Sequence, residues 1–273
     1  MNELFRHPAG MVGAGLLTII ALAVILGPFL APYDPQAFHP AVRLTGPSVA
    51  HWLGTDQFGR DILSRLLTGA GPTILFGVGA TALGVLAGSI IGVTAAVAGG
   101  WVDSVIMRTL DGLLAVPDLL FTLLIVTILG GGIGEAMLAV AVAFTPGMAR
   151  IARSSVLSIR TREYILAAIA RDESRAYIIV QEVIPNAIGP IIVEATIRVS
   201  FAIMIGATLG FLGLGAQPPS TEWGLMVAEA RQYMYRSPWV VAVPGIAIAV
   251  AALGFNLFGD ALRDAFDPRR RRR

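Results

Sequence analysis

Long apolar stretches without a charged side chain dominate the chain. Residues 8–33, 66–102, 199–221 and 237–259 contain no Asp, Glu, Lys or Arg. A helix that crosses the roughly 30 Å of bilayer hydrocarbon needs about 20 mostly apolar residues. Each stretch is long enough for one such helix, so the pattern predicts an all-α, polytopic membrane protein.

The pattern predicts six spans in all. The third and fourth spans have less well-defined bounds, because Asp118 interrupts the apolar run of the third and Arg150 closely follows the uncharged run of the fourth. Arg6 ahead of the first run leaves a signal peptide as the alternative, but the length of that run and the spans behind it favour a retained anchor. We place the spans at residues 10–31, 72–98, 113–129, 135–156, 199–221 and 237–259.

Composition supports this class and narrows the chemistry. Hydrophobic residues make up 55% of the chain and charged residues 14%, whereas a soluble domain has about 25% charged residues. The sequence has no cysteine and no lysine, so all 20 residues in the Lys and Arg count are arginines. Disulfides, thiolate metal sites and the lysine-containing phosphate loop are therefore excluded, and any ATP would be bound by another protein.

The arginines are distributed unevenly between the two sides of the predicted membrane. With both termini inside, the inner segments hold 14 arginines and the outer segments five, and Arg198 is counted within a span. Because cytoplasmic loops carry an excess of arginine and lysine, this count predicts that both termini are cytoplasmic. The remaining segments are then a long outer loop (32–71), an inner loop (157–188) and a second outer loop (215–237).

Small residues recur at every fourth position of the second span. They are Ala80, Gly84, Gly88, Gly92 and Ala96. Such a stripe lets another helix approach closely. We favour packing within the chain, and a subunit interface is the alternative.

Residues 59–68 ahead of this span have helical amphipathicity. Ile62 and Leu66 fall on one face, and Asp61 and Arg65 fall on the other. The segment is either a helix in the bilayer interface or an ordinary connector.

Two charges lie at membrane depth just before the uncharged part of the fifth span. Glu194 and Arg198 are four residues apart with the acid first, the favourable order for an ion pair on a helix. Charged groups in a membrane face the protein interior or a water-filled path. The pair has either a structural role or a role in a pathway.

The inner loop carries the most informative pattern. Residues 163–171 and 174–183 favour two short helices, and Pro185 ends the second. The first helix would present Ala167 and Ala168, whose small side chains let the backbone enter a partner's groove. Glu163 would offer a carboxylate to a basic residue. The alternative is a solvated loop with charged surface helices.

This loop resembles the "EAA" loop of permeases in binding-protein-dependent ABC importers, through Glu163-x-x-x-Ala167-Ala168 and the later Ile184-Pro185-Asn186. Three further stretches resemble the dipeptide and oligopeptide branch, specifically its second-type permease with a long first outer loop. They are HWLGTDQFGRDILSR at 51–65, FLGLGAQPP at 211–219 and FNLFGDALRD at 255–264. The likeness runs in order through nearly the whole chain.

The resemblance implies a five-helix MetI-like permease core (spans two to six) with an added N-terminal helix. It divides the chain into an anchor helix with its outer loop (1–71), a permease core (72–268) and a basic tail (269–273). It further implies a sister permease, two cytoplasmic ATP-binding subunits that hold ATP and Mg, and an extracytoplasmic solute-binding protein. No cofactor, metal or nucleic acid is expected on this chain, which would lie in a bacterial or archaeal cytoplasmic membrane.

The resemblance assigns the docking of an ATP-binding subunit to the inner loop. The residues that match are Glu163, Tyr164, Ala167, Ala168, Asp172, Pro185 and Asn186. Asp172 departs from the family, which usually has glycine there. Glycine permits a positive φ, and aspartate adopts it only at some cost. Either the turn differs, or Asp172 accepts the strain and its carboxylate caps the next helix.

Other classes of function fit the sequence less well. An intramembrane hydrolase would need a nucleophile and a base at membrane depth, but His7, His39 and His51 lie outside the spans and no HExxH or GxSxG motif occurs. A stand-alone carrier would not need the inner loop. A permease of the same branch for nickel or another small solute is the closer alternative to a peptide permease, because solute choice rests largely on the binding protein.

Overall fold

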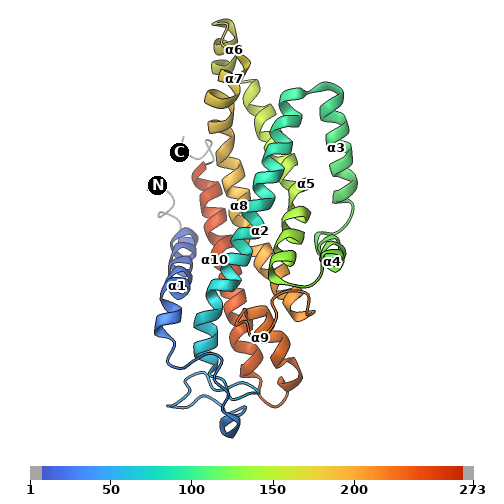
Figure 1. The fold of residues 1–273 in the computed structure, drawn as a ribbon. Coiled ribbons are helices and arrows are strands. Elements are labelled where there is room, and N and C mark those ends of the chain that lie inside the picture. The colour runs from blue at the N-terminus through green and yellow to red at the C-terminus, as the bar shows by residue number, and fades with distance from the viewer. Residues whose placement is uncertain (1–7, 267–273) are drawn as a thin grey trace.

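The computed structural model describes residues 8–266, and every regular element in that range is a helix (Figure 1). Its longest helices run side by side along the axis of the molecule. In chain order the elements are α1 (Pro8–Leu30), η1 (Pro40–Val42), α2 (Ile62–Ala98), α3 (Gly100–Leu114), α4 (Asp118–Leu129), α5 (Ile133–Arg160), α6 (Glu163–Ala170), α7 (Arg175–Tyr177), η2 (Ile178–Val183), α8 (Ile184–Phe211), α9 (Trp223–Ala230), η3 (Arg231–Tyr233) and α10 (Trp239–Phe266).

Five helical segments in the described range are long and apolar enough to cross a membrane. They are α1, α2, α5, η2 with α8, and α10, and the bent pair α3 and α4 makes a sixth if it counts as one span. The predicted number of spans is therefore reached only with that pair. The basic tail (269–273), Arg6 and both termini lie outside the described residues.

The third predicted span is not one straight helix. It covers only the last two residues of α3 and all of α4, and these two helices meet at an angle of 91° around Val116 and Pro117. Proline has no N–H to continue a helix, and it disfavours helical geometry in the residue before it. The prediction of a single helix over 113–129 was wrong for this reason.

The fifth span extends much further toward the N-terminus than its uncharged residues indicated. It runs from Ile178 to Phe211, so the predicted end at residue 221 was wrong. The helix ends where Gly213 adopts φ +77°. The N–H of Leu214 then donates to Leu209 O, and the N–H of Gly213 donates to Gly210 O, which is the Schellman pattern of a helix end.

The second span also starts earlier than predicted, because α2 begins at Ile62. Asp61 caps it, accepting a hydrogen bond from the N–H of Ser64 at 2.8 Å. The expected boundary at residue 71 therefore falls inside one continuous helix. Ile62 and Arg65 are each 1% exposed, so this first part of α2 packs inside the protein, and its polar face is not solvated.

The stripe of small residues on α2 is buried against α5. A Cβ on Gly84 would lie 2.8 Å from Ala141 O, and one on Gly88 would lie 2.7 Å from Thr145 O. Distances this short leave no room for a side chain, so the two backbones are in close contact. Packing within the chain, the favoured interpretation, is confirmed.

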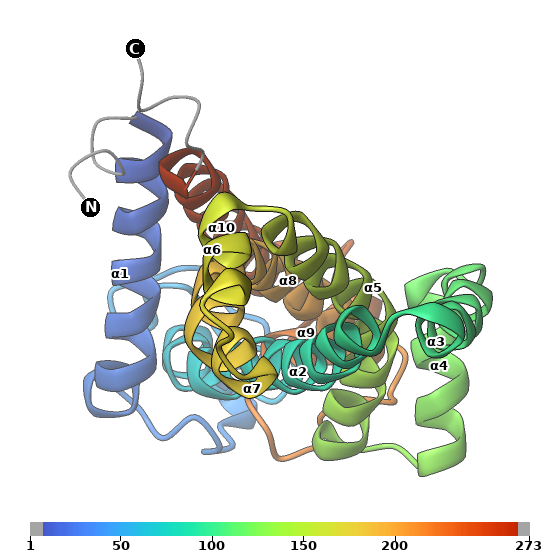
Figure 2. The same ribbon diagram turned by 90° about the horizontal axis from the view of Figure 1, so that it is seen from above.

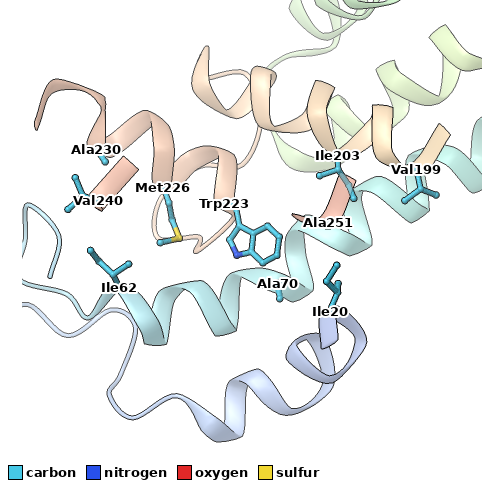
Figure 3. Close-up of a cluster of buried hydrophobic side chains, with 10 residues drawn as sticks. All are labelled: Ile20, Ile62, Ala70, Val199, Ile203, Trp223, Met226, Ala230, Val240 and Ala251. Carbon is cyan, nitrogen blue, oxygen red and sulfur yellow. The ribbon is translucent and has the colours of Figure 1, made fainter. Parts of the chain in front are cut away.

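The two ends of the molecule differ. We call the end that carries α6, α7 and η2 the knob end, and the opposite end the α9 end (Figure 1). Seen along the axis, α3 and α4 stand on one side of the central helices, and α1 stands on the other (Figure 2). At the α9 end, Trp223 and Met226 of α9 join Ile62, Ile203 and Val240 in an apolar cluster that ties α9 to α2, α8 and α10 (Figure 3).

Candidate functional site

The knob, which we define as residues 163–183, is fixed to the ends of three long helices. Ile165 of α6 and Val183 of η2 are both 2% exposed, and they pack in one cluster with Ala96 of α2 and Val156 of α5. The Arg160 guanidinium also donates to the carbonyl of Ala96 at 2.6 Å. The knob is therefore packed onto the ends of α2 and α5 and runs directly into α8.

The end of α6 shows why Asp172 is unusual. Its φ is +58°, the left-handed region. The N–H of Glu173 donates to Ala168 O, and the N–H of Asp172 donates to Ile169 O, so α6 ends in a Schellman motif with Asp172 at the position that favours glycine. The turn thus keeps the geometry of a glycine turn, and Asp172 accepts the strain.

The other half of that prediction was wrong, because Asp172 does not cap the following helix. Ser174 does, since its hydroxyl accepts a hydrogen bond from the N–H of Tyr177 at 3.2 Å. The carboxylate of Asp172 instead lies at the C-terminal end of α6, where a negative charge is unfavourable to the helix dipole.

One face of α6 is left uncovered at the tip of the molecule. Glu163 in its first turn is exposed, as is Ala167, and Tyr164, Leu166 and Ile169 are 40%, 55% and 56% exposed. Ala168 is fully buried, so the expectation that both alanines are presented to a partner holds only for Ala167. The spacing of Ile165 and Ala168 gives the helix a buried side, and its remaining apolar residues face outward.

Pro185 and Asn186 lie at the junction between the knob and α8, and both are exposed. The preceding segment, η2, is a π-helix, and the N–H of Ile184 donates to Ile179 O, five residues earlier. The side-chain amide of Asn186 donates to Glu182 O at 2.7 Å. This side-chain bond fastens Asn186 to the last part of the irregular turn.

A groove of about 660 Å³ lies beside the exposed face of the knob. Apolar side chains of α2, α5, α6 and η2 line it, and Arg160, Asp172 and Glu173 add its charges. The knob thus combines a projecting apolar helix with a hollow that has two acids at its edge.

Glu194 and Arg198 form the ion pair that the sequence predicts, with Arg198 Nε 3.1 Å from Glu194 Oε1. The guanidinium lies over the Phe144 ring, 5.0 Å from its centroid. A Cβ on Gly147 would come within 2.5 Å of Arg198 Nη2. Arg198 therefore lies flat against α5, and the side chain of Glu194 remains 30% exposed.

A buried charge network at the α9 end was missed from the sequence. Arg60 and Arg65 both pair with Asp56, at 2.6 and 3.2 Å, and with Glu229, at 2.7 and 3.0 Å. It joins the loop after α1 to α2 and α9. The amphipathic pattern of residues 59–68 suggested a solvated polar face, and no local signal pointed to Glu229, which lies 164 residues after Arg65.

Burial perturbs two carboxyls of this end. Burial raises the pKa of Glu222, although the N–H groups of Gly224 and Leu225 donate to it at 2.9 and 2.8 Å and oppose the shift. Burial likewise raises the pKa of Glu229, and the positive charge of Arg60 acts in the opposite sense. Both acids bind α9 to its surroundings.

Curated proteins resemble the chain over almost its whole length. It is 42% identical to the probable D,D-dipeptide transport system permease protein DdpC of Escherichia coli, over 96% of this chain and 88% of that protein. It is 41% identical to the dipeptide transport system permease protein DppC of Alkalihalophilus pseudofirmus, over 98% and 88%. It is also 39% identical to the glutathione transport system permease protein GsiD of Pectobacterium atrosepticum, over 94% and 86%.

The fold has a counterpart among solved structures. A chain of the MetNI methionine ABC transporter in an inward-facing conformation superposes with a TM-score of 0.61 at 19% identity, over 74% of this chain and 96% of that one. This confirms the MetI-like fold. Residues 1–47 match the N-terminal TM domain of oligopeptide transport permease C. Residues 84–272 match the binding-protein-dependent transport system inner membrane component, and the chain belongs to that family.

Proposed function

We propose that the chain is one permease subunit of an ATP-driven importer that moves short peptides inward. The relatives from Escherichia coli and Alkalihalophilus pseudofirmus are named for dipeptides, and the resemblance extends through both outer loops. The chain forms half of the path, and a sister permease forms the other half. It carries out no covalent chemistry itself.

The knob end is cytoplasmic in this proposal, and the α9 end faces outward. Arg150, Arg153 and Arg160 lie in α5, Arg162 lies in the turn that follows it, and Arg171 lies in the knob. Cytoplasmic segments are rich in arginine. The α9 end is then the side from which a solute-binding protein delivers its cargo. ATP and Mg are bound by two cytoplasmic ATP-binding subunits.

The observation that carries the proposal is the uncovered apolar face of α6 on a firmly anchored knob. Tyr164, Leu166 and Ile169 are exposed. In the proposed orientation they lie in water beyond the bilayer, which favours a partner surface over them. Glu163 stands at the start of this face and offers its carboxylate to a basic residue of an ATP-binding subunit. Ala167 lets the backbone of α6 approach that subunit closely.

Asp172, Pro185 and Asn186 act on docking indirectly. Asp172 sets where α6 ends, and Asn186 stabilises the turn that Pro185 opens between the knob and α8. Closure of the ATP-binding subunits would move the knob. Because the knob shares one apolar cluster with α2, α5 and α8, that movement would switch the permease between inward-open and outward-open states.

We assign a role in the pathway to the pair of Glu194 and Arg198. Glu194 is partly exposed on α8 at membrane depth, and a charge there is costly against lipid. A water-containing path between the two permease subunits removes that cost. The pair would face the peptide as it passes.

Reconstitution tests the proposal. The chain, co-expressed with its sister permease and the ATP-binding subunits, should purify as one complex and accumulate radiolabelled dipeptide in liposomes only with ATP and the binding protein. The purified chain alone should transport nothing. Uptake by the chain alone without ATP would contradict the proposal and favour a secondary carrier.

A further inference from the structure

We propose that the solute-binding protein docks on one particular surface of the α9 end, formed by the turn at residues 47–52 and the exposed arginines beside it. We call this turn the outer turn. The inference rests on the proposed function for its orientation.

The outer turn is held by hydrogen bonds within itself and to neighbouring residues. The N–H of Ser48 donates to His51 O at 2.8 Å, and the N–H of His51 donates back to Ser48 Oγ at 3.0 Å. The Tyr33 hydroxyl donates to Ala50 O at 2.8 Å. His51 Nδ1 lies 2.9 Å from Oδ1 of Asp61. A turn held this way loses little conformational entropy when a partner binds it.

The turn presents apolar side chains to solvent. Val49 is 95% exposed and Trp52 is 71% exposed. The segment between α1 and α2 that carries them forms the far end of the molecule, beyond the end of α1 (Figure 1). An exposed tryptophan on a rigid turn has the character of an interface hot spot, because it buries a large area with few rotatable bonds.

A second exposed segment lies alongside and includes Tyr235, 93% exposed. Tyr233 and Trp239 flank it and pack against the same apolar cluster as Leu44 and Leu53, which flank the outer turn. The two segments therefore belong to one surface.

The exposed charges of this surface are mostly positive. Arg43, Arg231 and Arg236 are exposed in or next to the two segments, and the Arg231 guanidinium lies 5.3 Å from the centroid of the Phe211 ring. Asp34 is exposed in the same loop as Arg43, while the acids of the charge network are paired or buried. The complementary partner is a protein with an acidic rim around an apolar pocket that receives Trp52. The chain belongs to a binding-protein-dependent family, so the binding protein is the partner to which we assign this surface.

The surface is also connected to the transport helices. Asp61 contacts His51 of the turn and caps α2. Arg65 in the next turn of α2 pairs with Glu229 of α9. A displacement of the outer turn on docking would therefore reach α2 and α9 through direct side-chain contacts.

The test measures how well the binding protein stimulates the whole complex. The complex in nanodiscs of neutral lipid is titrated with its own binding protein, loaded with dialanine, and ATP hydrolysis is recorded at two salt concentrations. Trp52→Ala should raise the half-maximal concentration of binding protein about tenfold. The double variant Arg231→Glu with Arg236→Glu should also raise this half-maximal concentration and should remove most of its dependence on salt. Trp101→Ala, an exposed tryptophan at the knob end, is the matched control and should leave it unchanged.

The outcomes separate this inference from the proposed function. Wild-type stimulation that Trp52→Ala and the arginine reversals leave unchanged would overturn the docking surface alone. A lower thermal midpoint in bilayers with the same half-maximal concentration would also overturn it, because it would assign Trp52 to lipid headgroups. No response of the wild-type complex to the binding protein would overturn the proposed function and this inference together.

Discussion

The guanidinium of Arg65 lies 3.0 Å from the carboxylate of Glu229, and the side chain of Arg65 is only 2% exposed. Without Arg65, the two carboxylates of Asp56 and Glu229 would share Arg60 alone, and an uncompensated buried charge costs about 3–5 kcal/mol. Arg65→Met should therefore lower the thermal midpoint of the purified chain strongly. The double variant Arg65→Met with Glu229→Met should regain part of the loss, since neither buried charge then remains unpaired. Equal midpoints for Arg65→Met and wild type would show that the network adds no stability.

Glu222 predicts a dependence of stability on pH. Burial raises its pKa above the ordinary value of 4.5, so the folded chain keeps this proton at a pH where the unfolded chain has lost it. The resulting stabilisation is complete below 4.5 and is lost as pH rises through the folded-state pKa. Glutamine cannot ionise, so the thermal midpoint of the Glu222→Gln variant should fall less than that of wild type as the pH rises from 4.5 through the folded-state pKa. Parallel curves for the two chains would contradict the assignment.

Asp172 should be replaceable by glycine with a gain in local stability. Its left-handed backbone costs a residue with a Cβ about 1 kcal/mol, and glycine avoids that cost. Asp172→Gly should slow hydrogen exchange of the α6 amides about fivefold. Asp172→Asn controls for the charge at the helix end, and Asp172→Ala should make exchange faster. Unchanged exchange in the glycine variant would mean that the turn carries no strain.

The pair of Glu194 and Arg198 predicts a coupled effect on transport. Glu194→Arg and Arg198→Glu should each reduce dipeptide uptake by the assembled importer. The double reversal should restore part of it, because the opposite charges again lie four residues apart. The oligomeric state of the complex, checked for each variant, serves as the control. Defects that simply add in the double variant would indicate that the two residues act separately.

Much of the fold could be predicted from the sequence. The long uncharged stretches predicted α1, α2 and α10, and the stripe around Gly84 and Gly88 predicted the contact of α2 with α5. The fifth span was misplaced because its bounds were taken from the uncharged residues alone, although Glu194 and Arg198 were expected to pair at membrane depth. The helix runs through this ion pair and ends ten residues earlier than predicted, at Phe211.

The parts that could not be predicted depend on distant contacts. Arg60 and Arg65 read as surface charges because their partner Glu229 is far away in the sequence. The burial of Ala168 follows from how α6 lies on the ends of α2 and α5, which its own eight residues do not determine. By contrast, the strained backbone of Asp172 was one of two alternatives that the departure from the family pattern left open, because φ at a helix end is a local property.

The central claim is that the knob couples this chain to ATP hydrolysis by a partner subunit, and Glu163 tests it most directly. Glu163→Ala and Glu163→Gln are compared with Asp260→Ala, an exposed acid of α10 outside the knob. The measurement is ATP hydrolysis by the assembled complex under stimulation by the loaded binding protein. Both Glu163 variants should lose most of the stimulated rate, with the binding protein's affinity for dipeptide unchanged, and Asp260→Ala should match wild type. A full stimulated rate in both Glu163 variants would contradict the claim.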